Sequence, residues 1–453
     1  MSISETIDAP ETTRIPLSFN QEFLCMFDTG GDDGPFGSHY NIVYGWRLDG
    51  RLDVEALREA LNDVVARHEA LRTSIETDEQ GRYQRVLPPS PVSLEVRDLS
   101  GTDPVDRDRI AGELVNEAEA GAYGIEEMPL LRGVLGRFDA RDAALVLIAH
   151  HSAVDEWSMR LLMRDLALCY AARRGQDAPA LPEVHQYQEF ARWQLDALAG
   201  GGGKARAYWR EKLSGAQVSA TRTDHPRSEN RPKTTSWHRF AIGKDTTAGI
   251  LKLSKTTRSS PFMILLAGYS LLLGKVNDST DIVVPTFASG RGQARFHDTV
   301  GSFFNFMPLR TDLTGAGTFR EVVRRVRATC MEAYSNDIPF AQVLEEAPAL
   351  MAPLGEDDRA VAAFQVFRSP FASDREVAGD LEYAEIPRRI DQPVGGDVPD
   401  GALWQLEIDS SGEILATLGF NSNLFDESTF TAQAAEFTRL LREAVADPDA
   451  PLS

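Results

Sequence analysis

The 453-residue sequence has few cysteines and no long apolar run. Its three cysteines, Cys25, Cys169 and Cys330, form no CxxC motif and no framework of paired spacings, which is typical of a reducing compartment. No stretch of eighteen apolar residues occurs, and residues 1–13 are polar and acidic rather than basic and then apolar. We therefore expect a cytoplasmic protein without a membrane span or an export signal.

Positive charge is also scarce, with 47 Lys and Arg against 68 Asp and Glu, and a formal net charge of −21. This balance argues against nucleic acids and anionic membranes as partners. It does not identify a cationic substrate, because an acidic surface also keeps a protein soluble.

The histidines are mostly scattered along the sequence. The i, i+4 pair of His151 and Asp155 supplies only two ligands, whereas a metal site needs three or four, so we expect no metal.

The sequence AHHSAVDEWS at residues 149–158 is the strongest chemical signal. The apolar run 143–149 before it predicts a buried strand, and the periodic segment 159–174 after it predicts a helix that ends at Gly175. A histidine in the intervening loop would be held rigidly and can exchange a proton near neutral pH. An aspartate four residues after His151 could orient its ring or fix the loop. The sequence contains no GxSxG motif, which is the pattern that would have indicated a serine nucleophile.

Strands and helices alternate in both halves of the chain, which predicts an α/β (α+β) protein with two similar lobes. Residues 175–186 contain Gly and Pro and predict the crossing between lobes 1–178 and 179–453. Residues 200–203 predict a flexible loop between helices, and residues 216–236 a surface connector. Strands are expected at 71–75, 143–149, 235–242, 281–287, 403–408 and 414–420, the last two joined by a turn at 410–412, and helices at 53–68, 159–174, 261–273, 319–336 and 427–446.

Residues 149–158 resemble the HHxxxDG signature of condensation domains from nonribosomal peptide synthetases, and further blocks follow in that family's order. The resemblance extends from about residue 16 to about residue 430. The blocks are SFNQEFL (18–24), RHEALRT (67–73), YQEFARWQ (187–194), YWREKLSG (208–215), GSFFNFMPLR (301–310), NDIPFAQVL (336–344) and FNSNLFD (420–426).

The resemblance implies two chloramphenicol-acetyltransferase-like lobes in a V-shaped pseudo-dimer, with the active-site tunnel between them. It implies a condensation enzyme that joins an acyl or aminoacyl donor, carried as a thioester on the phosphopantetheine arm of a carrier protein, to an amine or alcohol. The product would be an amide or ester in antibiotic biosynthesis. Because no adenylation, thioesterase or carrier domain is present, we expect a free-standing monomer that binds no cofactor and meets its carrier protein in trans. Residues 35–47 favour the enediyne-tailoring type.

The resemblance also suggests residue roles. His151 is the expected general base or acceptor-positioning group, and Asp155 is expected to form an ion pair with Arg291 that supports the site. His150 is a second catalytic candidate, although a structural role is favoured because neighbouring side chains point in opposite directions. Glu156 stands where the family has Gly, and glutamate adds bulk and charge there. Substrate contacts are expected from Glu156, Trp157, Ser158 and Asn305, with helix capping the favoured role of Ser158.

Two other functions remain open. The first is an acyl-CoA-dependent O-acyltransferase of the HxxxD group, but the late DFGWG block of its plant members is missing here. Bacterial lipid acyltransferases share HHxxxDG but lack the blocks at 67–73 and 187–194. The second is a non-catalytic recruitment domain, against which the intact His151 argues.

Overall fold

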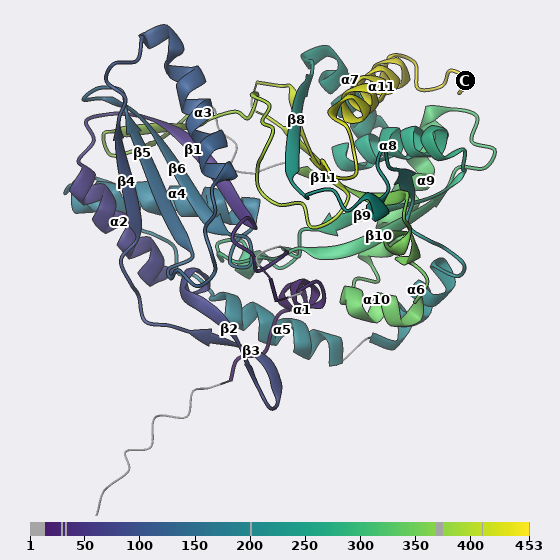
Figure 1. The fold of residues 1–453 in the computed structure, drawn as a ribbon, viewed down its shortest axis with the longest axis horizontal. Helices are drawn as coiled ribbons and strands as arrows, with labels where there is room; N and C mark the ends of the chain where they lie inside the picture. The colour runs from purple at the N-terminus through teal and green to yellow at the C-terminus, as the bar shows by residue number, and fades with distance from the viewer. Residues whose placement is uncertain are drawn as a thin grey trace, which may run out of the picture.

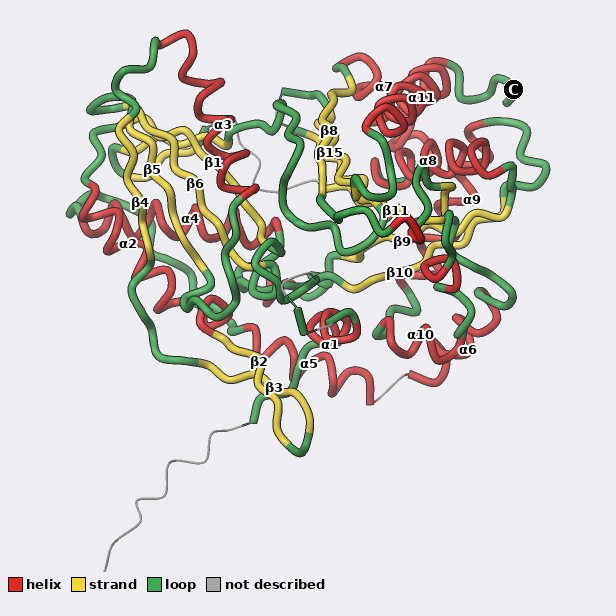
Figure 2. The backbone as a smooth tube through the Cα atoms, in the orientation of Figure 1, coloured by secondary structure: helices red, strands yellow, loops and turns green. Residues whose placement is uncertain are grey.

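The computed structural model describes residues 14–28, 30–31, 34–199, 202–367, 375–409 and 411–452. The polar segment 1–13, residues 200–201 of the expected glycine loop and Ser410 of the expected turn lie outside these residues. Two α/β lobes lie side by side in Figure 1, the first mainly purple and blue and the second mainly green and yellow. The yellow strands of Figure 2 form separate sheets in the two lobes.

The first lobe is built on a six-stranded sheet in the order β12-β13-β1-β6-β5-β4. Alternate residues of β6 face opposite ways: Leu145 and Leu147 pack with α2 and α4, whereas Val146 and Ile148 pack with α3. This two-sided burial explains why the expected strand is a continuous apolar run. The bounds are β1 Asn41–Asp49, β4 Ser93–Asp98, β5 Leu131–Arg137, β6 Asp142–His150, β12 Glu376–Ala378, β13 Leu381–Glu385, α2 Val54–Arg67, α3 Arg107–Ala120 and α4 Glu156–Arg173.

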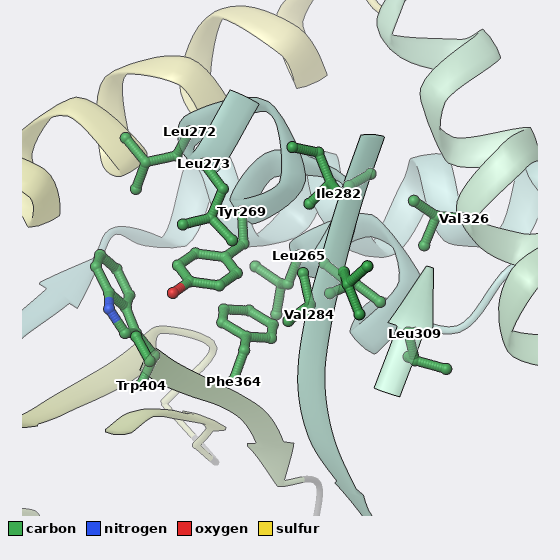
Figure 3. Close-up of a cluster of buried hydrophobic side chains, with 14 of the residues drawn as sticks. Leu265, Tyr269, Leu272, Leu273, Ile282, Val284, Leu309, Val326, Phe364 and Trp404 are labelled. Atoms are coloured by element: carbon green, nitrogen blue, oxygen red, sulfur yellow. The ribbon is translucent and has the colours of Figure 1, made fainter. Parts of the chain in front are cut away.

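The second lobe contains a five-stranded sheet, β7-β11-β14-β15-β8, and the pair β10-β9. Its core lies around α8, where Tyr269 stacks on Phe364 of β11 with ring centroids 4.5 Å apart and packs against Trp404 of β14 (Figure 3). The bounds are β7 Ala220–Arg222, β8 Thr235–Ile242, β9 Asp281–Ala288, β10 Asn305–Asp312, β11 Arg359–Phe367, β14 Ala402–Ile408, β15 Ile414–Asn421, α7 Lys244–Thr257, α8 Pro261–Asn277, α9 Phe319–Tyr334 and α11 Glu427–Ala446.

Among the described helices none is by itself long and apolar enough to cross a membrane. The pair α7 and α8 meets the length and composition test together but is bent by 108° between the two helices. Most of α8 is buried in the second lobe.

Smaller elements join the lobes at their base. The helix α1 packs against β10 and α10, and the N-cap residue Ser18 forms a 2.7 Å hydrogen bond with the hydroxyl of Tyr187, the first residue of α5. Tyr187 and Phe190 of α5 belong to the core of the first lobe, although they follow the expected boundary. The bounds are α1 Phe19–Met26, β2 Thr73–Asp78, β3 Gly81–Val86, α5 Tyr187–Ala199, α6 Gly202–Lys212 and α10 Phe340–Glu346.

Several expected elements are present with small shifts. Asp53 caps α2 by accepting hydrogen bonds from two backbone amides, as its sequence predicts, and β14 pairs with β15 as expected. The strand after α2 begins at Thr73, because residues 69–72 form a 3-10 turn, and α4 begins three residues earlier than expected, because Asp155 caps it.

Two expectations about the second half were wrong. Residues 216–236 are not only a surface connector, since β7 pairs with β11 and Val218 and Ala220 are buried. The proposed division into 1–178 and 179–453 is crossed by β12 and β13, because β13 pairs with β1 in the sheet of the first lobe. Both errors concern short strands whose partners lie far away in the sequence.

Candidate active site

A cavity of about 980 Å³ lies between the lobes, where the family resemblance implies the active site. The first lobe contributes Tyr40, His151 and Glu156 to its lining, and the second contributes Phe287 and Phe304. This volume is at the upper end of the range for small-molecule sites in proteins.

His151 follows directly after β6 and lines the cavity. Its Nδ1 lies 2.9 Å from the carbonyl oxygen of Val154, and because a carbonyl only accepts, Nδ1 must carry the hydrogen. In the neutral ring the lone pair is therefore on Nε2. Burial lowers the pKa of His151 below its usual value of 6.5, more than the nearby Asp155 raises it, so the ring is a neutral acceptor at pH 7.

Aromatic rings fix the orientation of His151. The imidazole stacks on the ring of Tyr40, with centroids 4.8 Å apart and planes 20° from parallel, and Phe304 meets it edge-on at 5.3 Å. Phe304 in turn packs against Phe287 at 5.1 Å and Phe23 at 6.1 Å, and all three line the cavity. The imidazole of His151 therefore lies at the edge of an aromatic wall formed by Phe23, Phe287 and Phe304.

His150 is the last residue of β6 and does not line the cavity. Its ring is 2% exposed, with Nδ1 2.7 Å from the hydroxyl of Ser152 and Nε2 3.3 Å from the carbonyl oxygen of Gly37. Burial lowers its pKa to about 4, so it stays neutral. The geometry corrects its inclusion among the catalytic candidates and matches the favoured structural role.

The expected ion pair between Asp155 and Arg291 is present, and it joins the two lobes. Arg291 Nε and Nη2 donate to the two carboxylate oxygens of Asp155 at 3.0 and 2.8 Å, in a bidentate arrangement. Its remaining N–H groups bond to the carbonyl oxygens of Phe296 and Thr299 and to the hydroxyl of Ser158. All five guanidinium donors are therefore satisfied although the side chain is buried.

Trp157 and Ser158 differ in their access to the cavity. The Trp157 side chain lines it and donates its indole N–H to the carbonyl oxygen of His297 at 2.9 Å. Ser158 is fully buried, outside the lining, and its hydroxyl donates to Asp155 at 2.6 Å. Ser158 is also not the helix cap, since Asp155 accepts the hydrogen bond from its backbone N–H at 2.7 Å. The expectation of a substrate contact from Ser158 is therefore wrong.

Glu156 is the first residue of α4 and lines the cavity. It is not among the described residues with positive φ, so the backbone here does not require the family's glycine. Burial raises the pKa of the carboxyl to about 7, and the nearby charges of Asp155 and Glu407 act in the same direction. An ionisable group that titrates near neutral pH thus lies five residues after His151.

Asn305 lies at the start of β10 and lines the cavity. Its side-chain amide donates to Asp337 at 2.7 Å and to the carbonyl oxygen of Ile338 at 2.8 Å, while its Oδ1 is buried without a partner among the described residues. Burial also raises the pKa of Asp337.

Sequence reasoning missed Tyr40, Phe304 and Asp337 as site residues, although all three lie in segments that it had compared with the family.

The expected absence of a metal site is not tested by the structure. His238, Asp391 and Glu427 form the one cluster of His, Cys and carboxylate ligands found among the described residues. Both carboxylates are exposed, and none of the three residues lines the cavity.

Comparisons with known proteins agree on the same family. Residues 11–357 match the family model described as Condensation domain. A linear gramicidin synthase polypeptide from Brevibacillus parabrevis is 31% identical over 444 residues, which cover 96% of this chain and 8% of the synthase polypeptide. The chain thus spans less than a tenth of that relative.

Solved structures cover the chain almost completely. SgcC5 from Streptomyces globisporus, solved in complex with (R)-(-)-1-(2-naphthyl)-1,2-ethanediol and sucrose, is 48% identical, with a TM-score of 0.92 over 96% of this chain and 100% of the other. The X-domain from teicoplanin biosynthesis is 25% identical, with a TM-score of 0.76 over 99% and 98% of the two chains.

Proposed function

We propose, because this chain belongs to the condensation domain family, that it transfers an acyl or aminoacyl group from a carrier-protein thioester to an amine or alcohol. Its relatives include synthetases of peptide antibiotics, and the family is one of acyltransferases. The observation that carries the proposal is His151, which lines the cavity between the lobes with Nδ1 bonded to Val154 and Nε2 left as the acceptor.

The geometry supports general-base catalysis. Nε2 of His151 takes the proton from the acceptor's hydroxyl or amine as that group attacks the thioester carbonyl. The C–S bond then breaks, and the imidazolium returns the proton to the departing thiolate, which leaves as the thiol of the carrier's phosphopantetheine arm. A positioned base contributes about 10²- to 10⁴-fold, and the ion pair of Asp155 and Arg291 keeps the loop that carries it in place.

The aromatic wall supports an acceptor that carries an aromatic or other flat apolar group. SgcC5 was solved with a naphthyl diol, and by analogy we propose an alcohol of that kind as the acceptor here. An ester would then be the product, formed with a carrier protein supplied as a separate partner. Tailoring of an enediyne core in the cytoplasm is the more specific proposal, which rests on the resemblance of residues 35–47 alone.

The test uses the purified chain with a radiolabelled acyl group presented either on a carrier protein or on coenzyme A, and with the naphthyl diol as acceptor. We expect product from the carrier thioester and a fall of about 10²-fold or more in His151→Ala. The matched control is His185→Ala, which removes an exposed histidine outside the cavity lining. Equal activity in His151→Ala and the control would contradict the proposal, and a preference for coenzyme A would favour an O-acyltransferase.

A second candidate is a recruitment domain, which the likeness to the X-domain favours. Another solved structure that is similar to this chain is a complex of that X-domain with OxyB. Product formation that persists undiminished with the His151→Ala chain in the producing cell would support this alternative.

A further inference from the structure

The lining of the cavity is rich in carboxyl groups. Among the described residues, six acidic residues and two arginines line it. The acidic residues are Glu119, Asp155, Glu156, Asp337, Asp397 and Asp400, and the arginines are Arg291 and Arg388. The net charge of the cavity lining therefore depends on which of these carboxyls form an ion pair with a basic side chain.

Four of the six carboxyls have such a partner within 3 Å. The pairs are Asp155 with Arg291, Glu119 with Arg239 and Arg388, Asp397 with Lys233, and Asp400 with Arg227. Asp337 instead accepts a hydrogen bond from the amide of Asn305. Glu156 forms no ion pair with any basic side chain in the described part of the chain, and it is only 9% exposed.

Arg160 does not form an ion pair with Glu156. The charge of Arg160 acts on the Glu156 carboxyl, but its guanidinium is bonded to Glu385 at 3.0 Å and to Glu407, and it lies over the ring of Tyr44. The dipole of its own backbone N–H also acts to lower the pKa of the Glu156 carboxyl, but burial outweighs it. A buried carboxylate without a counter-ion is costly, so a ligand that brings a positive charge to it gains affinity.

We propose that Glu156 binds a protonated amine on the acyl donor, so that the site selects an aminoacyl group over a plain acyl group. The proposal rests on the condensation function given above. The amine in question cannot be the nucleophile, because an amine held as ammonium has no lone pair with which to attack. A carboxylate beside it therefore also prevents this amine from competing with the acceptor for the thioester.

The position of Glu156 fits this role. It lies five residues after His151, and its charge acts on Tyr40, whose ring stacks on the His151 imidazole. An ammonium at Glu156 would thus lie on the same wall as the base. Glycine, which the resemblance leads us to expect at this position, offers no such charge, so the substitution changes which donor is preferred rather than whether condensation occurs.

Binding of three stable probes tests the proposal without any turnover. The probes are amides of N-acetylethylenediamine with phenylalanine, with 3-amino-3-phenylpropanoic acid and with 3-phenylpropanoic acid, which differ in the presence and place of the amine. We expect one amino probe to bind the full chain about 10- to 100-fold more tightly than the desamino probe, as a charged hydrogen bond of about 1.5–3 kcal/mol predicts. Calorimetry measures the ratio.

Substitutions then assign the preference to Glu156. In Glu156→Gln and Glu156→Gly the ratio should fall to about one while the affinity for the desamino probe changes little. The matched control is Asp337→Asn, which alters the other lining residue whose carboxyl has no basic partner among the described residues and should keep the ratio. A ratio near one in the unaltered chain, a ratio kept in Glu156→Gln, or a ratio lost in Asp337→Asn would overturn the proposal.

Turnover separates this proposal from the condensation function. With carrier-bound donors, Glu156→Gln should lower kcat/KM for the preferred aminoacyl group more than that for the desamino group. His151→Ala should lower turnover with both donors by about 10²-fold or more and keep the binding ratio. Loss of turnover in His151→Ala with no amine preference in the unaltered chain would refute the role of Glu156 and keep the condensation function. An amine preference in binding without turnover in the unaltered chain would support the role of Glu156 and refute the condensation function.

Discussion

Removal of Arg291 should destabilise the protein more than any other single change at the site. Arg291→Met keeps most of the apolar stem but removes five N–H donors and leaves the carboxylate of Asp155 buried without its counter-ion. Removal of one partner of a buried ion pair lowers the free energy of unfolding by about 3–5 kcal/mol. Loss of the bonds to the carbonyl oxygens of Phe296 and Thr299 acts in the same direction.

A double-mutant cycle measures the coupling. Asp155→Asn keeps a good N-cap residue but removes the charge, and the double variant Asp155→Asn/Arg291→Met removes both charges together. We expect the double variant to cost at least about 2 kcal/mol less than the sum of the two single variants. Urea unfolding followed by tryptophan fluorescence measures these free energies, and Trp157, whose ring lies 5.4 Å from the Arg291 guanidinium, reports on the site itself.

A surface pair provides the control. Arg320 and Asp449 form a 2.7 Å ion pair with both side chains more than 40% exposed, and breaking it should cost no more than about 1 kcal/mol. Additive free energies at Asp155 and Arg291, within about 0.5 kcal/mol, would refute the reasoning, as would equal losses at the buried and the exposed pair.

Three further predictions concern the cavity. His151→Ala should lower kcat about 10²- to 10⁴-fold with little change in melting temperature. His150→Ala should instead lower the melting temperature, because its ring is bonded within the fold. The opposite pattern would show that His150 is the catalytic residue and His151 the structural one. With a desamino donor, the acidic limb of kcat/KM should lie below pH 6.5, because burial lowers the pKa of His151, and a limb above 6.5 would contradict this. Folding raises the Glu156 pKa from 4.5 to about 7, so the carboxyl destabilises the fold increasingly as pH rises through that window. Glu156→Gln should therefore stabilise the chain at pH 8, by up to about 3 kcal/mol, and much less at pH 4.5, and an equal gain at both would refute the assignment.

The sequence alone determined the features that local patterns encode. A capping aspartate followed by apolar residues at helical spacing predicted α2, and two apolar runs around a short polar turn predicted the β14–β15 pair. The HHxxxD pattern placed His151 at the end of a buried strand because strand, loop and helix follow one another within about 30 residues. The family resemblance, rather than periodicity, predicted the partnership of Asp155 with Arg291.

The tertiary structure decided what depends on residues far apart in the chain. β13 is separated from β1 by more than 300 residues, and β7 is too short for its own pattern to reveal a sheet position. The sequence identified Glu156 as unusual, but only the fold shows that Arg160 is bound to Glu385, 225 residues away. Among the residues that the structure describes, the Glu156 carboxyl is thus left without a counter-ion. Whether a buried charge is neutralised depends on distances between side chains of both lobes, and these distances are set when the lobes pack together.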